Sequence, residues 1–123
     1  ARPERPMNGL ARGMLQSELG EIVGPEHVSW GEAEKLVYST DWFWLPQMWL
    51  DRGERLREPD LIVHPGTPEE VAEVLKVANS YRAPVIPWGG GSGSQGGALP
   101  LFGGIILDTK RLNRILELDE TSL

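Results

Sequence analysis

The sequence predicts an α+β or α/β fold built around one small sheet. Short apolar runs bounded by Pro, Gly and Asp indicate buried strands at 61–63, 84–87 and 105–107. Between the first two runs lies an amphipathic stretch with helical spacing, and a run of glycines at 88–97 separates the last two. The order strand, helix, strand, glycine loop, strand therefore forms the centre of the predicted fold.

A helical arm, assigned to residues 1–58, precedes these strands. Apolar residues recur at helical spacing from Leu10 to Ile22, and Gly24 followed by Pro25 ends this predicted helix. A short second helix is expected over 31–38. The apolar residues expected to share one face of the first helix are Met14, Leu15, Leu19 and Ile22.

Aromatic residues crowd the segment 41–49, which follows neither the strand period nor the helix period. Four of the five tryptophans lie between Trp30 and Trp49. We interpret this Trp-rich segment first as a hydrophobic anchor that packs the arm onto the rest of the protein. The alternatives are an oligomer or domain interface and a shallow contact with a membrane surface, which the acidic charge disfavours.

The second segment, assigned to residues 59–123, contains the best-defined helix. Thr67 is expected to cap this helix, Pro68 suits its first position, and Glu70 completes a capping box. The run Ile115–Leu118 is predicted as a fourth strand. Because no helix follows to cover the sheet, we expect the chain to be the front part of a longer protein. Residues predicted on the buried helix face are Val71, Val74, Leu75, Ala78 and Tyr81.

The composition argues against several classes of function. With 18 acidic and 12 basic residues the net charge is −6, which disfavours nucleic-acid binding. The chain has no cysteine for disulfides or thiolate chemistry, and His27 and His64 lack the acidic partners of a metal site.

No apolar run reaches the roughly 20 residues of a membrane span, and the first residues lack a signal-peptide core. We expect a cytoplasmic protein, with peripheral membrane contact as the alternative.

The glycine run 88–97 has the clearest chemistry. Glycine permits positive φ and close approach of a ligand, and successive N–H groups form an anion-binding nest. A flexible Gly/Ser linker is disfavoured because apolar strands flank the run closely. A P-loop is excluded because its lysine is missing. Gly91, Gly93 and Gly96 match a dinucleotide motif by chance, since no helix is predicted to follow them.

Ordered motifs in the second segment resemble the FAD-linked oxidase family, whose cofactor domain is of the vanillyl-alcohol oxidase type. The opening strand, helix start, second strand and glycine loop occur in the family's order at 59–65, 67–71 and 84–93. Residues 96–100 are similar to the glycolate oxidase and D-lactate dehydrogenase branch, and residues 104–116 also resemble alkyldihydroxyacetonephosphate synthase. The resemblance implies the N-terminal half of that FAD-binding domain, an α+β structure with a small mixed sheet and flanking helices.

In this family the backbone amides of the loop hold the pyrophosphate of FAD. Trp88 stands where many members have Arg, so one charge contact is missing. Ser92 stands near the His that links the flavin covalently in some members, which implies non-covalent FAD here. The cofactor-binding residues implied by the resemblance are Pro87, Trp88, Gly89, Gly90, Gly91, Ser92, Gly93, Gly96 and Gly97.

The resemblance implies an FAD-dependent oxidoreductase that oxidises a 2-hydroxy acid or a related alcohol, a small-molecule substrate. An alkyldihydroxyacetonephosphate synthase-like flavoenzyme and a non-catalytic nucleotide-binding half-domain are the alternatives. Catalytic residues are expected beyond Leu123, so this chain alone is expected to be inactive. By analogy with the family, Tyr38 and Asp41 lie near the flavin. The expected partner is the remainder of the same protein or a second copy of the chain.

Overall fold

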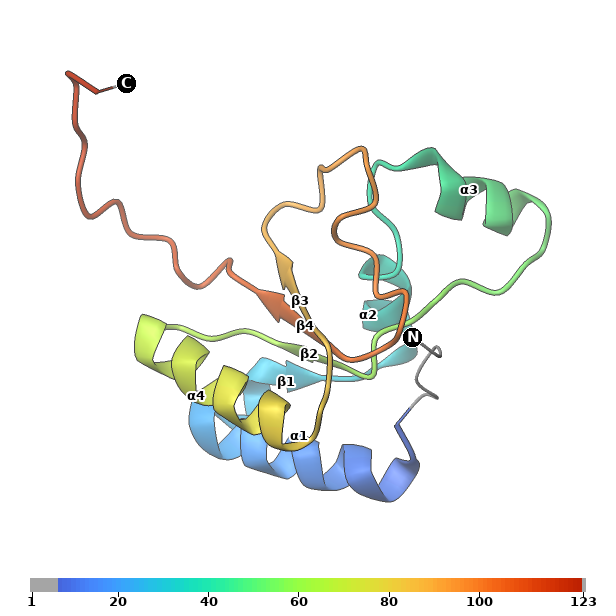
Figure 1. Cartoon of the computed structure of the whole chain (residues 1–123), viewed down its shortest axis with the longest axis horizontal. Coiled ribbons are helices and arrows are strands. Elements are labelled where there is room, and N and C mark those ends of the chain that lie inside the picture. The colour runs from blue at the N-terminus through green and yellow to red at the C-terminus, as the bar shows by residue number, and fades with distance from the viewer. Residues whose placement is uncertain (1–6, 123) are drawn as a thin grey trace.

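The computed structural model describes residues 7–122, which contain a four-stranded mixed sheet (Figure 1). The strand order is β1-β2-β4-β3, with β1 antiparallel to β2 and the other two pairings parallel. This arrangement confirms the predicted α+β class with a small mixed sheet and flanking helices. The strands are β1 (Val28–Ser29), β2 (Leu61–Val63), β3 (Val85–Trp88) and β4 (Ile105–Asp108), and the helices are α1 (Gly9–Val23), the 3-10 turn η1 (Pro25–His27), α2 (Glu32–Val37), α3 (Trp44–Asp51) and α4 (Pro68–Ser80).

The two central strands bury both of their faces, because successive side chains of a strand point to opposite sides. Helices α1 and α4 lie side by side against one face (Figure 1). The fully buried residues of this larger cluster are Leu15, Leu19, Leu61, Val63, Val74 and Ile105. The smaller cluster on the other face contains Tyr38, Ile62, Trp88 and Ile106. Residues on both sides of the predicted boundary at 58 therefore share these clusters, and the division into two segments stays a prediction.

Helix α4 begins at the predicted position. The Thr67 hydroxyl accepts a hydrogen bond from Glu70 N at 3.1 Å, and Pro68 is the first helical residue. The Glu70 carboxylate, however, accepts a hydrogen bond from Gly66 N at 2.6 Å, one residue before the position that a capping box requires. The carboxylate therefore ties the loop after β2 to the helix start.

Two side chains assigned to buried helix faces are exposed instead. Met14 is 54% exposed because α1 turns Leu15, Leu19 and Val23 toward the sheet. Leu75 of α4 is 42% exposed. Each of these residues lies at the border of an apolar face, where the spacing alone does not decide on which side of the border it falls.

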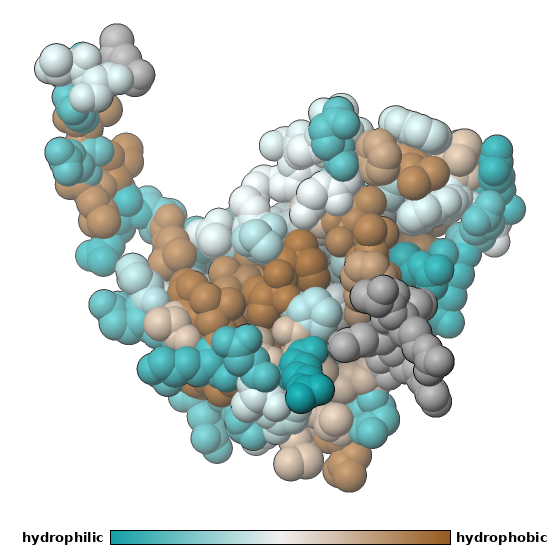
Figure 2. All heavy atoms as spheres, viewed as in Figure 1, coloured by the Kyte–Doolittle hydropathy of each residue, from teal (hydrophilic) through white to brown (hydrophobic). Residues whose placement is uncertain are grey.

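The predicted strand at 115–118 is wrong, and the fourth strand is β1. After β4 the chain runs away from the sheet as an extended tail (Figure 1), and its apolar side chains stand clear of the body (Figure 2). Ile115, Leu116 and Leu118 are 88%, 86% and 78% exposed. A strand needs a hydrogen-bonding neighbour, and within residues 7–122 the run 115–118 pairs with no strand, while β1 pairs with β2.

The Trp-rich segment forms α3 and the turn before it. Trp42 and Trp44 are 79% and 63% exposed, so these two side chains do not pack the arm onto the described part of the following segment. Their packing onto a part of the protein beyond this chain stays a prediction. Trp49 borders a cleft of about 700 Å³ that it shares with Leu56 and Phe102. None of the helices in residues 7–122 has the length and apolarity needed to cross a membrane.

Candidate functional site

Three parallel strands end at the same edge of the sheet, and polar residues gather there. β2 is followed by His64, β4 ends at Asp108, and β3 ends at Trp88, which pairs in register with Asp108. The glycine loop begins directly after Trp88. Ligands of open α/β sheets bind beyond the carboxyl ends of the strands. This edge is therefore the candidate site.

Asp108 is fully buried and lies at the centre of a polar cluster with Tyr38, His64 and Lys110. Its Oδ2 atom accepts hydrogen bonds from the Tyr38 hydroxyl at 2.5 Å and from Lys110 Nζ at 3.1 Å, and its Oδ1 accepts one from Lys110 N at 2.8 Å. His64 Nε2 lies 3.3 Å from the Tyr38 hydroxyl and 3.6 Å from Asp108 Oδ2. Both carboxylate oxygens thus have partners, as a buried charge requires.

These contacts shift two pKa values in opposite directions. Burial by itself raises the pKa of Asp108, but the hydrogen bonds from the Tyr38 hydroxyl and from Lys110 together outweigh it, so the pKa is lowered. The pKa of Tyr38 is raised, first by burial and then by its hydrogen bond to the Asp108 carboxylate. At neutral pH the cluster therefore holds an ionised carboxylate beside a neutral phenol.

The raised pKa of Tyr38 predicts a loss of stability in alkaline solution. Because the folded protein keeps the phenol protonated, the contribution of Tyr38 is complete below its ordinary pKa of 10.0 and is lost as the pH rises above that value. We expect the urea midpoint of the wild-type protein to fall more between about pH 8 and about pH 11 than that of Tyr38→Phe. Equal falls in the two proteins would contradict the role of the phenol.

Tyr38 connects this cluster to the glycine loop through Trp88. The two rings make an edge contact with centroids 4.8 Å apart, and Trp88 is 5% exposed. The indole lies against Gly91, whose φ is +64° and where a Cβ atom would collide with the ring. Thr109 donates two hydrogen bonds to the Trp88 carbonyl oxygen, from its N–H at 3.0 Å and its hydroxyl at 3.1 Å. The buried Trp88 therefore supports the start of the loop.

The end of the arm contacts the later part of the loop. Trp42 N donates a hydrogen bond to Gly93 O at 3.0 Å, and the Phe43 ring leaves room only for a glycine at Gly96. Asp41 Oδ1 accepts a hydrogen bond from Phe43 N at 2.9 Å. Its Oδ2 atom is buried beside Gly93 and has no hydrogen-bond partner among the described residues. The arm thus forms one wall of the glycine loop.

The predicted cofactor-binding residues fall into two groups, the end of strand β3 and the glycine loop that follows it. Pro87 and Trp88 are the last two residues of β3. In the part of the chain that the structure describes, the backbone N–H groups of residues 89–97 donate no hydrogen bond. These free donors fit the anionic pyrophosphate that the resemblance implies. The exposed residues are Gly89, Gly90, Ser92, Gly93 and Gly97, and the half-buried ones are Gly91 and Gly96.

The sequence prediction omits Asp108 and Lys110. The sequence signal for both residues is an acidic residue at the end of a buried strand, followed by a cation two positions later. Such a residue lies at the edge of the sheet where ligands bind.

The segment between β3 and β4 contains no helix, which confirms that the dinucleotide motif is accidental. Within residues 7–122 no group of three or more His, Cys, Asp and Glu side chains is arranged to hold a metal ion.

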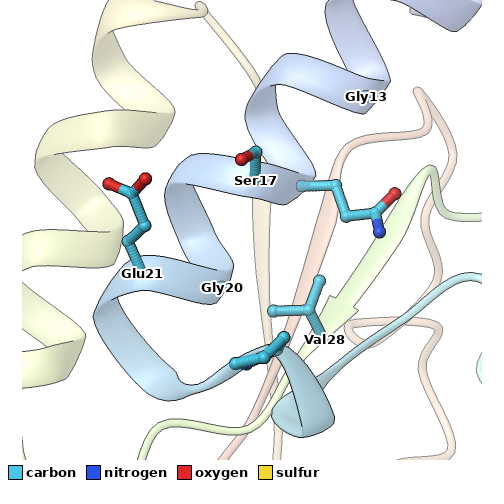
Figure 3. Close-up of a pocket in the computed structure, with 7 residues that line it drawn as sticks. Gly13, Ser17, Gly20, Glu21 and Val28 are labelled. Atoms are coloured by element: carbon cyan, nitrogen blue, oxygen red, sulfur yellow. The ribbon is translucent and has the colours of Figure 1, made fainter.

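A separate concavity of about 480 Å³ lies between α1 and β1 (Figure 3). Glu21 is the one ionisable side chain among the residues that line it, and none of them belongs to the glycine loop or to the Asp108 cluster. This concavity is therefore not part of the candidate site. Its lining residues are Gly13, Gln16, Ser17, Gly20, Glu21, Pro25 and Val28.

Known proteins share both sequence and fold with this chain. The sequence model of a family described as FAD binding domain matches residues 59–123, more than half of the chain. The chain is 33% identical over 109 residues to glycolate oxidase subunit GlcD of Bacillus subtilis, covering 89% of this chain and 21% of that protein. It is 31% identical over 104 residues to a probable mitochondrial D-lactate dehydrogenase of Danio rerio, with coverages of 85% and 19%. The chain thus spans about a fifth of the length of these curated relatives.

Solved structures give the same result for the fold. Alkyldihydroxyacetonephosphate synthase superimposes on 94% of this chain with a TM-score of 0.78 and 25% identity, covering 23% of its own chain. p-Cresol methylhydroxylase with substrate bound superimposes on 94% with a TM-score of 0.73 and 21% identity, covering 22% of its own chain, and shows the fold alone. These findings confirm the predicted resemblance, the predicted fold and FAD as the cofactor. The chain belongs to the FAD binding domain family.

Proposed function

We propose that this chain is the first part of a flavin-dependent oxidoreductase that oxidises a 2-hydroxy acid or a related alcohol, with the pyrophosphate of FAD held by residues 88–97. The observation that carries this proposal is the exposed glycine loop, whose N–H groups have no partner among the described residues. A bound anion satisfies these donors without any Lys or Arg in the loop. Two relatives, a glycolate oxidase subunit and a D-lactate dehydrogenase, support a hydroxy acid as substrate.

The residues of this chain bind and position the cofactor. The N–H groups from Gly89 to Gly93 would hold the pyrophosphate. Trp88 and Tyr38 support the loop, and the arm forms the wall beside Gly93. The bound FAD would supply the acceptor for the hydride equivalent of the substrate. Ser92, in place of a histidine, supports non-covalent attachment. Substrate contacts and catalytic residues belong to the sequence beyond Leu123.

A second candidate is a flavoenzyme of the alkyldihydroxyacetonephosphate synthase type. The structural likeness, with a TM-score of 0.78 at 25% identity, favours this candidate. The synthase type differs from the first proposal in its outcome, because flavin assists a carbon–oxygen exchange without net oxidation of a hydroxy acid. The two candidates share the cofactor site described above.

The experiment uses the protein that contains this chain together with its downstream sequence. The visible flavin spectrum is recorded without oxygen, before and after addition of glycolate or D-lactate. We expect the flavin band to bleach with a hydroxy acid, and denaturation to release free FAD. A flavin band that persists with every hydroxy acid tested would contradict the oxidase and leave the synthase type. Purified protein that takes up no flavin would leave only a non-catalytic half-domain.

A further inference from the structure

In the proposed function the glycine loop binds a dianion without a cation of its own. Residues 88–97 contain no Lys or Arg, and the whole chain carries a net charge of −6. Trp88 is apolar and 5% exposed, so its side chain offers no charge either. The long-range field of such a chain opposes the approach of a pyrophosphate. A nearby cation would offset this opposition, and this inference rests on the proposed binding of FAD at the loop.

Lys110 is a cation held at this edge of the sheet. Its Nζ atom is fixed 3.1 Å from Asp108 Oδ2, and Asp108 pairs in register with Trp88, the residue before the loop. The ammonium also lies 5.5 Å from the centroid of the Tyr38 ring, which itself contacts the Trp88 indole. Lys110 therefore belongs to the same packed group that supports the loop.

Three other cations near the loop in sequence have other partners or lie at the far end of β3. Arg111 donates a hydrogen bond to His64 O at 2.7 Å and lies 3.8 Å from Glu70. Arg82 precedes β3 and thus lies at the opposite end of that strand from the loop. Lys76 pairs with Glu73 on the exposed side of α4 at 2.6 Å.

The geometry of Lys110 leaves donors for a ligand. An ammonium group has three N–H donors, and the structure gives Lys110 Nζ one hydrogen bond, to Asp108 Oδ2. The Lys110 side chain is 61% exposed, whereas the Asp108 carboxylate behind it is fully buried. Lys110 therefore screens the buried negative charge from an anion that approaches the edge.

We propose that Lys110 is the cationic contact of the cofactor's diphosphate, and that Asp108 is the positioning residue that aims its ammonium group. Lys110 thereby supplies the charge that Trp88 does not. A lysine acts in phosphate sites as a point charge, so the contact requires proximity and no paired geometry.

The test uses the longer protein that contains this chain and compares three variants, Lys110→Gln, Lys110→Arg and Lys76→Gln. Lys76→Gln is the control, because it removes a lysine of α4 instead. Dissociation constants are measured for FAD and for ADP, a probe with the diphosphate and no flavin. We expect Lys110→Gln to weaken both by about tenfold, the loss typical of one charge-assisted hydrogen bond. Lys110→Arg restores most of the affinity, and Lys76→Gln stays within about twofold of wild type. The loss shrinks as salt is raised, because salt screens an exposed charge.

Three results would overturn the inference. One is an unchanged affinity of Lys110→Gln for both ligands, and another is a loss that salt does not alter. A loss for FAD without a loss for ADP would place the contact at the flavin and not at the diphosphate. If wild-type protein binds neither ligand, the proposed function itself fails, which distinguishes that failure from the failure of Lys110.

Discussion

Asp108→Ala is expected to lower the free energy of unfolding by about 3 kcal/mol, the largest stability effect in the candidate site. The carboxylate is fully buried and accepts hydrogen bonds from the Tyr38 hydroxyl and from Lys110 N. Alanine leaves these donors without a partner and opens a void at the end of β4. Urea denaturation followed by far-UV circular dichroism measures the change.

Two controls separate this effect from a general loss of a negative charge. Asp119 also accepts hydrogen bonds, from Thr121 and Ser122, but lies exposed in the tail, so Asp119→Ala should leave the urea midpoint unchanged. Asp108→Asn keeps one acceptor oxygen and should lose less stability than Asp108→Ala. If Asp108→Ala and Asp119→Ala had the same urea midpoint, the buried cluster would not stabilise the fold.

Gly91→Ala is expected to weaken FAD binding by at least about tenfold while the protein stays folded. An alanine at φ +64° costs roughly 1–2 kcal/mol. Its Cβ atom would also collide with the Trp88 indole. Because the indole is held by Tyr38, the loop has to move instead of the ring, and the N–H groups that follow lose their alignment.

Gly89→Ala is the matched control for this prediction. It lies in the same loop with no positive φ and with open space around the position of a Cβ atom. Because an alanine keeps the backbone N–H group of this position, the FAD dissociation constant should stay within about twofold of wild type. Equal affinities of Gly91→Ala and wild type, measured by titration of flavin fluorescence, would show that the loop conformation does not matter for binding.

Local signals in the sequence predict the elements that have their own boundary chemistry. Thr67 and Pro68 define the start of α4, and apolar runs between Pro and Gly define the three parallel strands. The two-residue strand at Val28 has no such signal, since it is too short to show a period. The apolar run at 115–118 does have such a strand signal, but no strand within the described residues pairs with it. Local pattern and tertiary pairing disagree at these two positions.

The candidate site likewise has one part that the sequence predicts and one part that depends on tertiary packing. The glycine loop is visible in the sequence because a nest needs consecutive glycines. The Asp108 cluster is not visible, since its members come from positions 38, 64, 108 and 110 and meet through the pairing of β2 with β4 and the packing of α2 against β2. The support that Trp88 gives to Gly91 likewise depends on the packing of Tyr38, which belongs to a different segment of the chain.

Hydrogen–deuterium exchange of the loop with and without FAD tests most directly whether residues 88–97 hold the pyrophosphate. The N–H groups of residues 89–97 have no partner among the described residues, so they should exchange quickly in the free protein. With FAD bound, exchange from Gly89 to Gly93 should slow markedly, while exchange in the exposed tail at 115–118 should not change. Protein that shows the flavin spectrum with unchanged exchange over 88–97 would contradict the assignment and place the pyrophosphate elsewhere.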